Sequence, residues 1–282
     1  MRTLVVTDST AYIPADYAAR LGIEIIPLQV LIGDKSYEEG GEGADAILTA
    51  LRQGVLATTS KPTPERFLES YRRAAAAGFD AVVSIHLSKA ISGTYDSALV
   101  AASQASIPVH VVDSKSLAMG LGFAAVSAAH AAEEGLDATE VAQIATSRAH
   151  ATISYFTVAT LEQLRRSGRI SRGKALVASA LAIRPILTIE DGEIVAFEKV
   201  RTSTKAIERL EELAIAAARG RSVDIAIHHL GALDLANTVS DWIQGGLAEG
   251  GLVSEVIVSE VGAVVGAHTG PGMIAVVISP RI

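Results

Sequence analysis

The sequence predicts an α/β protein with two domains: a parallel α/β/α sheet in residues 1–152 and an α+β domain with antiparallel strands in residues 153–282. Two observations predict this fold class. In the first part, short runs of β-branched and apolar residues alternate with alanine-rich stretches, which is typical of buried parallel strands separated by helices. In the second part, two apolar runs flank Asp191-Gly192, a dipeptide that favours a β-hairpin and therefore antiparallel pairing.

The strands expected in the first domain are apolar along their whole length, so both faces of the sheet should be buried. Pro14 can open the helix that follows the first strand, and Gly22 can close it. The expected strands are residues 4–6, 23–32, 81–85 and 109–112. The other expected helices are residues 44–53, 64–77, 94–106, 120–134 and 137–149.

The second domain is expected to mix the hairpin with helices. Its expected strands are residues 153–159, 184–189, 193–200, 224–227, 256–259 and 273–278. Its expected helices are residues 161–167, 172–182, 203–219 and 233–244. The glycine-rich segment 262–272 is expected to be a turn between the last two strands. Because no proline- or serine-rich linker separates the halves, we expect them to share a large interface.

Composition excludes several classes of protein. Hydrophobic residues make up 49% of the 282 residues, which excludes a disordered chain. The 24 Lys and Arg against 31 Asp and Glu give a net charge of −7, which argues against nucleic-acid binding. The most apolar stretches, 117–126 and 175–183, are shorter than the roughly 20 residues of a membrane span. The first residues turn polar too early for a secretory signal, so we expect a soluble, cytoplasmic protein.

The sequence contains few residue patterns that are typical of a metal site or a nucleotide-binding site. The chain has no cysteine, and its seven histidines include no pair at helical i,i+4 spacing. His228 and His229 are adjacent in an expected strand and should point to opposite faces. The patterns at 41–46 and 120–125 fit G-x-G-x-x-A, but neither directly joins a strand to a helix. We therefore expect no metal and no cofactor, and a nucleotide-binding enzyme would rest on these two patterns alone.

Hydroxyl side chains cluster at three expected strand ends, at Asp8-Ser9-Thr10, Thr58-Thr59-Ser60 and Ser92-Gly93-Thr94. In an open α/β sheet, ligands bind at the carboxyl ends of the strands. A helix that begins there offers unpaired backbone N–H groups to an anion. Ser92 could equally be only a helix cap, but three such clusters together favour a binding site.

Two further features point to a site. The segment Gly266-Ala267-His268-Thr269-Gly270-Pro271-Gly272 places one histidine among three glycines and a proline, which favours a functional role for His268. Residues 165–174 hold five basic side chains and no acid, and Arg201 and Lys205 follow. Such a run is usually a solvated face, but in an acidic protein it can steer an anionic ligand or partner.

Short motifs along nearly the whole chain occur in a specific order and spacing. They are Val6-Thr7-Asp8-Ser9-Thr10 with Ile13-Pro14, Pro27-Leu28, Thr59-Ser60 before Pro62, Leu87 through Ser92-Gly93-Thr94-Tyr95 with Ser97-Ala98, Val112-Asp113-Ser114, Leu164 with Gly168-Arg169-Ile170, Pro185-Ile186-Leu187, Arg201-Thr202 with Lys205-Ala206, and His268-Gly270-Pro271-Gly272. This set resembles the DegV family, bacterial fatty-acid-binding proteins that serve as the binding subunit of fatty acid kinase.

The resemblance implies a protein that is not itself an enzyme but buries a long-chain fatty acid and holds its carboxylate for a separate kinase subunit. ATP and Mg²⁺ would belong to that partner, and the pathway would be phospholipid metabolism. The residues implied at the ligand are Thr59, Ser60, Ser92, Gly93, Thr94, His268 and Gly270. Those implied at the head group or the partner are Arg169, Arg201 and Lys205.

Two positions depart from the family pattern. Lys61 stands where the family usually has glutamine, and Lys89-Ala90 occupy positions often filled by small polar residues. Lys61 could add charge to the carboxylate site or point into solvent. The basic residues between 165 and 205 could contact the ligand, the kinase or, transiently, a membrane surface.

The alternative is a serine acyl hydrolase that uses Ser92, His268 and an acid, either Asp113 or Asp8. The chain lacks a G-x-S-x-G nucleophile elbow. Nucleophilic catalysis also requires the serine and the histidine within about 3 Å of each other.

Overall fold

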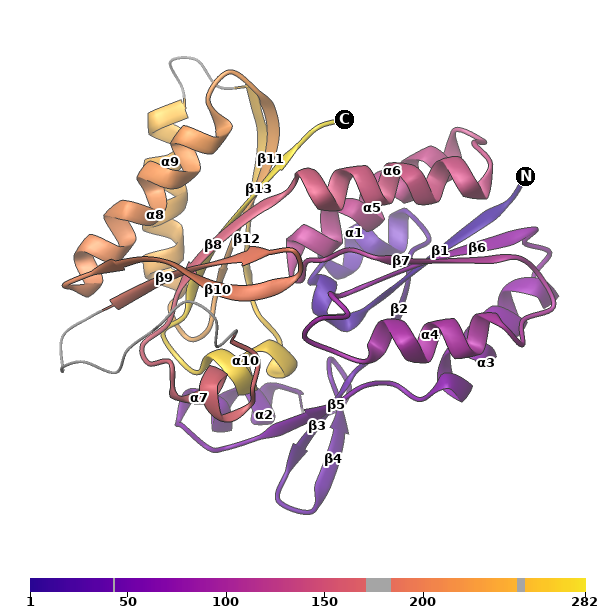
Figure 1. Ribbon diagram of the computed structural model, residues 1–282, viewed down its shortest axis with the longest axis horizontal. Helices are drawn as coiled ribbons and strands as arrows, with labels where there is room; N and C mark the ends of the chain where they lie inside the picture. The colour runs from indigo at the N-terminus through magenta and orange to yellow at the C-terminus, as the bar shows by residue number, and fades with distance from the viewer. Residues whose placement is uncertain (43, 171–183, 248–251) are drawn as a thin grey trace.

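The chain folds into three β-sheets with helices between and around them (Figure 1). A computed structural model describes residues 1–42, 44–170, 184–247 and 252–282. Helix 172–182 of the sequence prediction falls outside these residues, as do Arg172, Lys174 and Gly43. The fold class is confirmed: one sheet is parallel, and the other two contain antiparallel strands.

The first sheet has the order β2-β1-β6-β7 and is parallel throughout. Its strands are β1 (Thr3–Asp8), β2 (Glu24–Ile26), β6 (Ala81–His86) and β7 (Val109–Asp113). All residues of β1 and β6 are buried, as the apolar runs predicted. Leu4 and Val6 pack toward α3 (Pro64–Ala76) and α4 (Thr94–Ala102), while Val5 faces α5 (Met119–Glu133) and α6 (Ala138–Ala151).

The second sheet has the order β10-β9-β8-β13-β11-β12, with one parallel pair between β11 and β12. Its strands are β8 (Ile153–Thr157), β9 (Arg184–Glu190), β10 (Glu193–Val200), β11 (Ser222–His229), β12 (Leu252–Glu260) and β13 (Ile274–Pro280). Asp191 and Gly192 join β9 to β10 with φ of 49° and 86°, the left-handed pair that a tight hairpin requires. The predicted hairpin is therefore confirmed.

Helices α5 and α6 lie between the two large sheets, and α8 (Ser203–Ala218) and α9 (Leu233–Leu247) cover the outer face of the second sheet (Figure 1). One core joins Val5 of the first sheet and Leu121 of α5 to Ala226 and Val277 of the second sheet. Buried Arg148 of α6 reinforces this contact through Asp224 and Ser279. The division into domains at residues 152 and 153 stays a prediction. Within the described residues, no helix combines the length and apolarity that crossing a membrane requires.

A third, small sheet was not predicted. Its strands are β3 (Gln29–Ile32), β4 (Lys35–Glu38) and β5 (Thr58–Ser60), in the antiparallel order β4-β3-β5. The prediction of one extended strand over 23–32 is wrong, because Pro27 separates β2 and β3 into different sheets. Near this sheet lie the helices α2 (Ala44–Arg52), α7 (Glu162–Arg166) and α10 (Ala263–Thr269) (Figure 1).

One predicted helix and one predicted turn differ from the structure. The helix expected over 94–106 ends at Ala102. The turn expected over 262–272 contains α10, which ends at Thr269. Gly270 caps it with φ of 71°, a conformation that a side chain would strain. The two further short helices are η1 (Ser9–Ala11) and α1 (Ala15–Arg20), the latter opened by Pro14 and followed by Gly22 as predicted.

Candidate functional site

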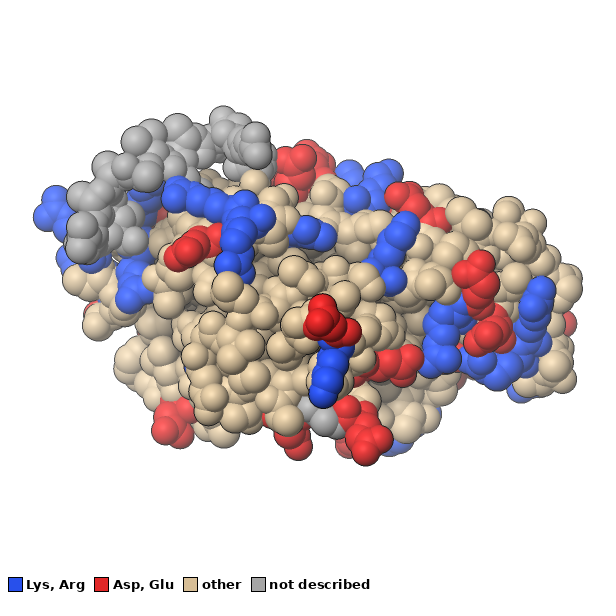
Figure 2. All heavy atoms as spheres, turned by 90° about the horizontal axis from the view of Figure 1, so that it is seen from below, with Lys and Arg blue, Asp and Glu red and all other residues tan. Residues whose placement is uncertain are grey.

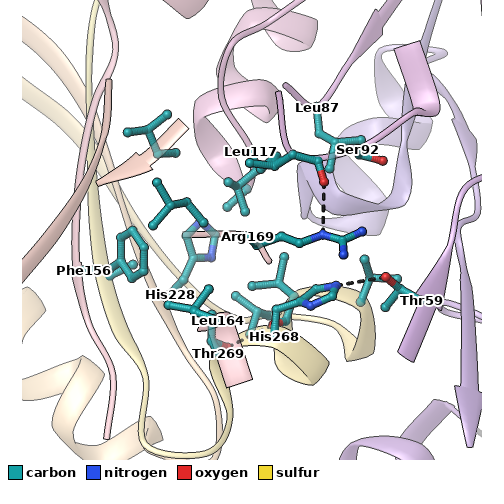
Figure 3. A pocket seen from close by; sticks show the side chains of 18 of the residues that line it. Thr59, Leu87, Ser92, Leu117, Phe156, Leu164, Arg169, His228, His268 and Thr269 are labelled. Carbon is teal, nitrogen blue, oxygen red and sulfur yellow. Dashed lines mark hydrogen bonds between the residues drawn. The ribbon is translucent and has the colours of Figure 1, made fainter. Parts of the chain in front are cut away.

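A pocket of about 340 Å³ lies between the inner face of the second sheet, α10 and the loops that follow β6 and β7 (Figure 3). This volume is within the range of small-molecule sites. Most of its wall is apolar, and the structure places Leu117, Phe156, Leu164, Ile194, Val265 and Met273 there. Sequence reasoning did not place these residues, because their convergence depends on how the two sheets meet.

Polar side chains gather at one end of this pocket, which we call the polar end. Figure 3 shows Thr59 and Ser92 there and Phe156 at the opposite end, which we call the deep end. Of the residues predicted at the ligand, five line the pocket: Thr59, Ser60, Ser92, Gly93 and His268. They come from β5, the loop before α4, and α10, which are far apart in the sequence.

His268 is the best-positioned polar group of the pocket. It lies in the last turn of α10, and its Nε2 is 2.9 Å from Thr59 Oγ1. Burial, helped by the nearby charge of Arg169, lowers the pKa of His268 to about 4. The ring is therefore neutral at pH 7. Its Nδ1 is buried and has no hydrogen-bond partner among the described residues, so it can serve a ligand.

Ser92 precedes Gly93, the N-cap of α4, so Ser92 is not the helix cap itself, and its role at the ligand stays a prediction. Its Oγ is 2.9 Å from Thr94 Oγ1 and accepts a hydrogen bond from the Thr94 N–H at 3.3 Å. Thr94 is fully buried and supports Ser92 without lining the pocket. At Gly93, an added Cβ would come within 2.9 Å of Lys61 Cδ, so glycine lets the exposed Lys61 side chain cross the pocket rim.

Of the basic residues predicted near the ligand, Arg169 lines the pocket. Its Nε donates to the Ile91 carbonyl at 3.3 Å (Figure 3). Its Nη1 donates to the Ser167 carbonyl at 2.5 Å. Arg201 and Lys205 are exposed at the start of α8 and are not among the described residues of the pocket wall. Figure 2 shows Lys and Arg side chains spread over the lower face of the molecule, with acidic side chains between several of them.

Glu39, which sequence reasoning did not single out, fixes the helix that carries His268. Its Oε1 accepts hydrogen bonds from the Val264 N–H at 2.7 Å and from the Tyr12 hydroxyl at 3.2 Å. Its Oε2 accepts from the Ser9 hydroxyl at 2.6 Å. Burial raises the pKa of Glu39. At the other end of α10, a side chain on Gly270 would meet Gln163 Nε2 at 2.9 Å, so Gly270 supports the site rather than lining it.

Of the three hydroxyl clusters predicted at strand ends, the first and the third follow strands of the parallel sheet and the second does not. The first cluster serves the fold: buried Asp8 accepts hydrogen bonds from the Thr10 N–H, from His86 Nδ1 and from the Leu87 N–H. The second cluster belongs to β5, a strand of the small sheet, rather than to the end of a core strand. Only the third both follows a strand of the parallel sheet and lines the pocket.

The arrangement does not support a hydrolase. Ser92 is bonded to Thr94, and His268 is bonded to Thr59. Asp8 is bonded to His86 instead of His268. Asp113 Oδ1 accepts from the backbone N–H groups of Lys89 and Lys115. The hydrogen bonds among the described residues thus join neither Ser92 to His268 nor His268 to Asp8 or Asp113, as a triad would require.

His228 lines the pocket with both ring nitrogens occupied. Its Nε2 accepts a hydrogen bond from the Met119 N–H at 3.1 Å, so Nδ1 carries the proton and donates to Ser259 Oγ at 3.0 Å. Burial lowers the pKa of His228 to about 4. Strand alternation predicts that His228 and His229 point to opposite faces of β11.

We expect the protein to lose stability as the pH falls from 6.5 toward about 4. The folded-state pKa values of His228 and His268 lie below the ordinary 6.5, so the unfolded chain takes up protons first. Each histidine then lowers the free energy of unfolding by up to about 1.4 kcal/mol per pH unit. Glu39 acts in the opposite direction, because its pKa is raised.

Denaturant unfolding of the protein and of His228→Gln, at neutral pH and at about pH 5, measures this dependence. The glutamine keeps an acceptor for the Met119 N–H but cannot take up a proton, so the variant should show a flatter pH dependence. Equal slopes for the two proteins would contradict the assignment of a neutral, buried His228.

Comparison with known proteins decides the family. The model of the family described as "Uncharacterised protein, DegV family COG1307" matches residues 2–281. The chain belongs to the DegV family. A DegV domain-containing protein of Streptomyces coelicolor is 50% identical over 278 residues, covering 98% of each chain.

Two solved DegV structures are similar over the full length of both chains. One, from Thermus thermophilus, is described by its fatty acid binding; it shares 34% identity with a TM-score of 0.90. The other, DegV from Bacillus subtilis, is described as a fatty acid binding protein and shares 33% identity with a TM-score of 0.89. The resemblance of the sequence motifs to the DegV family is thereby confirmed.

Proposed function

We propose that this DegV protein binds one long-chain fatty acid, with the acyl chain in the apolar part of the pocket and the carboxylate at its polar end. The observation that carries the proposal is the division of one pocket into an apolar deep end and a polar end where Thr59, Ser92 and His268 converge. The DegV proteins of Thermus thermophilus and Bacillus subtilis, described as binding fatty acids, support the same ligand class.

Most of the affinity would come from the acyl chain. Each buried CH₂ group contributes about 0.8 kcal/mol, so a sixteen-carbon tail gains roughly 12 kcal/mol before the costs of ordering it. The polar end would contribute by solvating the carboxylate. A carboxylate removed from water without hydrogen bonds would be costly, so hydroxyl and N–H donors and the positive charge of Arg169 compensate for its lost hydration.

The proposed carboxylate site draws on both predicted domains. Residues 1–152 contribute Thr59, Ser60, Ser92 and Gly93, with Thr94 supporting Ser92. Residues 153–282 contribute Arg169 and His268, with Gly270 supporting α10. Neutral His268 can donate one hydrogen bond to the carboxylate without adding a charge.

We further propose that the bound carboxylate is phosphorylated by a separate fatty acid kinase subunit, which supplies ATP and Mg²⁺. Two residues at the polar end, Ser60 and Lys61, are exposed to solvent. A partner could therefore approach the carboxylate there. Arg201 and Lys205 are exposed and would offer positive charge to that partner or to a membrane surface.

Ser92→Ala tests the carboxylate site. We expect the fatty acid to bind about tenfold more weakly, because a hydrogen bond to a charged group is worth about 1.5–3 kcal/mol and other donors compensate in part. Displacement of a fluorescent fatty acid measures this affinity. The methyl ester of the same acid has no negative charge, so its affinity should change much less.

The ester also serves as the control for chain binding. If Ser92→Ala weakened the acid and the ester by the same factor, Ser92 would act on the fold or the chain rather than on the carboxylate. With a fatty acid kinase subunit and ATP added, acyl phosphate formation should fall in the same variant. Unchanged formation would contradict a role for Ser92 in presenting the carboxylate.

A further inference from the structure

A second cavity, of about 270 Å³, adjoins the start of α10. Ala263 of α10 lines this cavity, whereas Val264 and Val265 of the same helix line the pocket described above. The first turn of α10 therefore lies between the two cavities. Most of the wall of the second cavity is apolar, and the residues concerned are Ile13, Ile25, Val30, Ile47, Leu48 and Ala263.

Val261 connects the walls of the two cavities. It lies directly before Gly262, the N-cap of α10, and among the residues that the structure describes it is the one that lines both cavities. Val261 is 0% exposed, and its N–H donates to the His229 carbonyl at 2.9 Å, which fixes it to the end of β11. The pocket and the second cavity thus approach each other at this side chain.

The packing of Val261 places it at the deep end of the pocket. It belongs to one apolar cluster with Phe156, Met273 and Ala275. His268, at the polar end, lies in the last turn of α10, whereas Val261 lies ahead of the first turn. An acyl chain that starts near His268 and follows the apolar wall therefore runs toward Val261.

The wall around Val261 is held in place by its neighbours. Glu39 accepts hydrogen bonds from the Val264 N–H at 2.7 Å and from the Tyr12 hydroxyl at 3.2 Å. A Cβ added at Gly262 would collide with the Glu39 carboxyl group, so the backbone next to Val261 is packed directly against it. Because close-packed interiors yield little, a chain that is too long for the pocket would meet Val261 rather than displace it.

We propose that Val261 sets the upper limit of acyl-chain length by closing the pocket toward the second cavity, which would take the end of a longer chain if this side chain were smaller. This inference rests on the proposed fatty acid binding and names a residue that determines its chain-length specificity. The chain end suits the second cavity because the wall there is apolar and meets that of the pocket at Val261. It would also cover Ile25, a large apolar side chain that is 36% exposed.

The test measures the affinities of saturated fatty acids of increasing length by displacement of a fluorescent fatty acid from the full-length protein. In the unchanged protein, affinity should rise with length and stop rising once the chain reaches Val261. In Val261→Ala, affinity should continue to rise beyond that length by up to about fourfold for each further CH₂ group. An acid that exceeds the limit by two or three carbons should therefore gain about tenfold over a shorter acid.

Two further variants define what the gain means. Val239→Ala removes the same two methyl groups from a fully buried position of α9 that lines neither cavity, so it should keep the length limit of the unchanged protein. Ala44 lines the second cavity at the start of α2, so adding Ala44→Phe to Val261→Ala should fill that cavity and cancel the gain. Thermal unfolding checks that each variant is folded, and Val261→Cys, a smaller change at the same site, should shift the limit in the same direction.

The outcomes separate this inference from the proposed function. If folded Val261→Ala and Val261→Cys keep the length limit of the unchanged protein, the inference is overturned. A gain that persists after Ala44→Phe is added would place the additional carbons elsewhere, and an equal gain in Val239→Ala would point to a general loosening of the core; either result also overturns it. If the unchanged protein binds none of the acids, fatty acid binding itself fails.

Discussion

Replacing Ala275 with phenylalanine is expected to abolish fatty acid binding while the protein still folds. Ala275 lies on β13, opposite Phe156, and its side chain faces the pocket. A phenyl ring there would occupy the space that we assign to the acyl chain. Excluding about six CH₂ groups removes roughly 5 kcal/mol, which is a loss of more than a thousandfold in affinity. Displacement of a fluorescent fatty acid, together with thermal unfolding, measures both parts of this prediction.

Ala216→Phe provides the matched control, because it adds the same ring on the exposed side of α8. That variant should bind the fatty acid as the unchanged protein does. Full binding by Ala275→Phe, with a normal unfolding transition, would mean that the acyl chain lies elsewhere.

Asp8→Ala is expected to lower the free energy of unfolding by about 3–5 kcal/mol, among the largest effects of any single change. Asp8 is fully buried and accepts hydrogen bonds from the Thr10 hydroxyl, His86 Nδ1 and the Leu87 N–H. Alanine would leave these buried donors without an acceptor. Denaturant unfolding followed by circular dichroism gives the change directly.

Asp113→Ala is the matched control at the end of β7, a strand of the same parallel sheet that is separated from β1 by β6. Asp113 is only partly buried, and its Oδ1 accepts from the N–H groups of Lys89 and Lys115, which lie in exposed residues. Water can replace those bonds, so we expect a loss of about 1 kcal/mol. Similar losses in the two variants would contradict the structural role assigned to Asp8.

The layers of the fold could be predicted because the local sequence patterns favour the same strands, helices and turn that the tertiary contacts stabilise. The apolar run of β1 and β6, the alanine-rich α5 and α6, and the Asp191-Gly192 turn each encode their own structure. The small sheet could not be predicted in this way. Its strand β5 consists of Thr58, Thr59 and Ser60, a short polar run that is defined by its pairing with β3.

Helix α10 shows why the site was harder to predict than the fold. Glycines at 262, 266, 270 and 272 favour a turn, and a helix of this length is marginal in isolation. The helix forms because Glu39, distant in the sequence, accepts a hydrogen bond at its start. His268 was identified from its glycine-rich surroundings, but its contact with Thr59 depends on the position of α10.

The deep end of the pocket had no local signal in the sequence. Phe156, His228 and Ala275 belong to three different strands and meet only through the register of the second sheet. The polar residues at the other end could be predicted from sequence motifs, because Thr59-Ser60 and Ser92-Gly93-Thr94 are contiguous in the sequence. Motifs could therefore indicate the head group, whereas the shape of the chain pocket requires the structure.

Extraction of the natively purified protein into organic solvent, followed by mass spectrometry, shows whether the pocket holds a fatty acid. We expect long-chain fatty acid in the extract at about one molecule per chain, because the apolar part of the pocket makes release into water costly. Protein carrying Ala275→Phe, purified in parallel, should yield none. Native protein that is consistently free of fatty acid, and that takes up none when it is supplied, would mean that the pocket does not bind fatty acids.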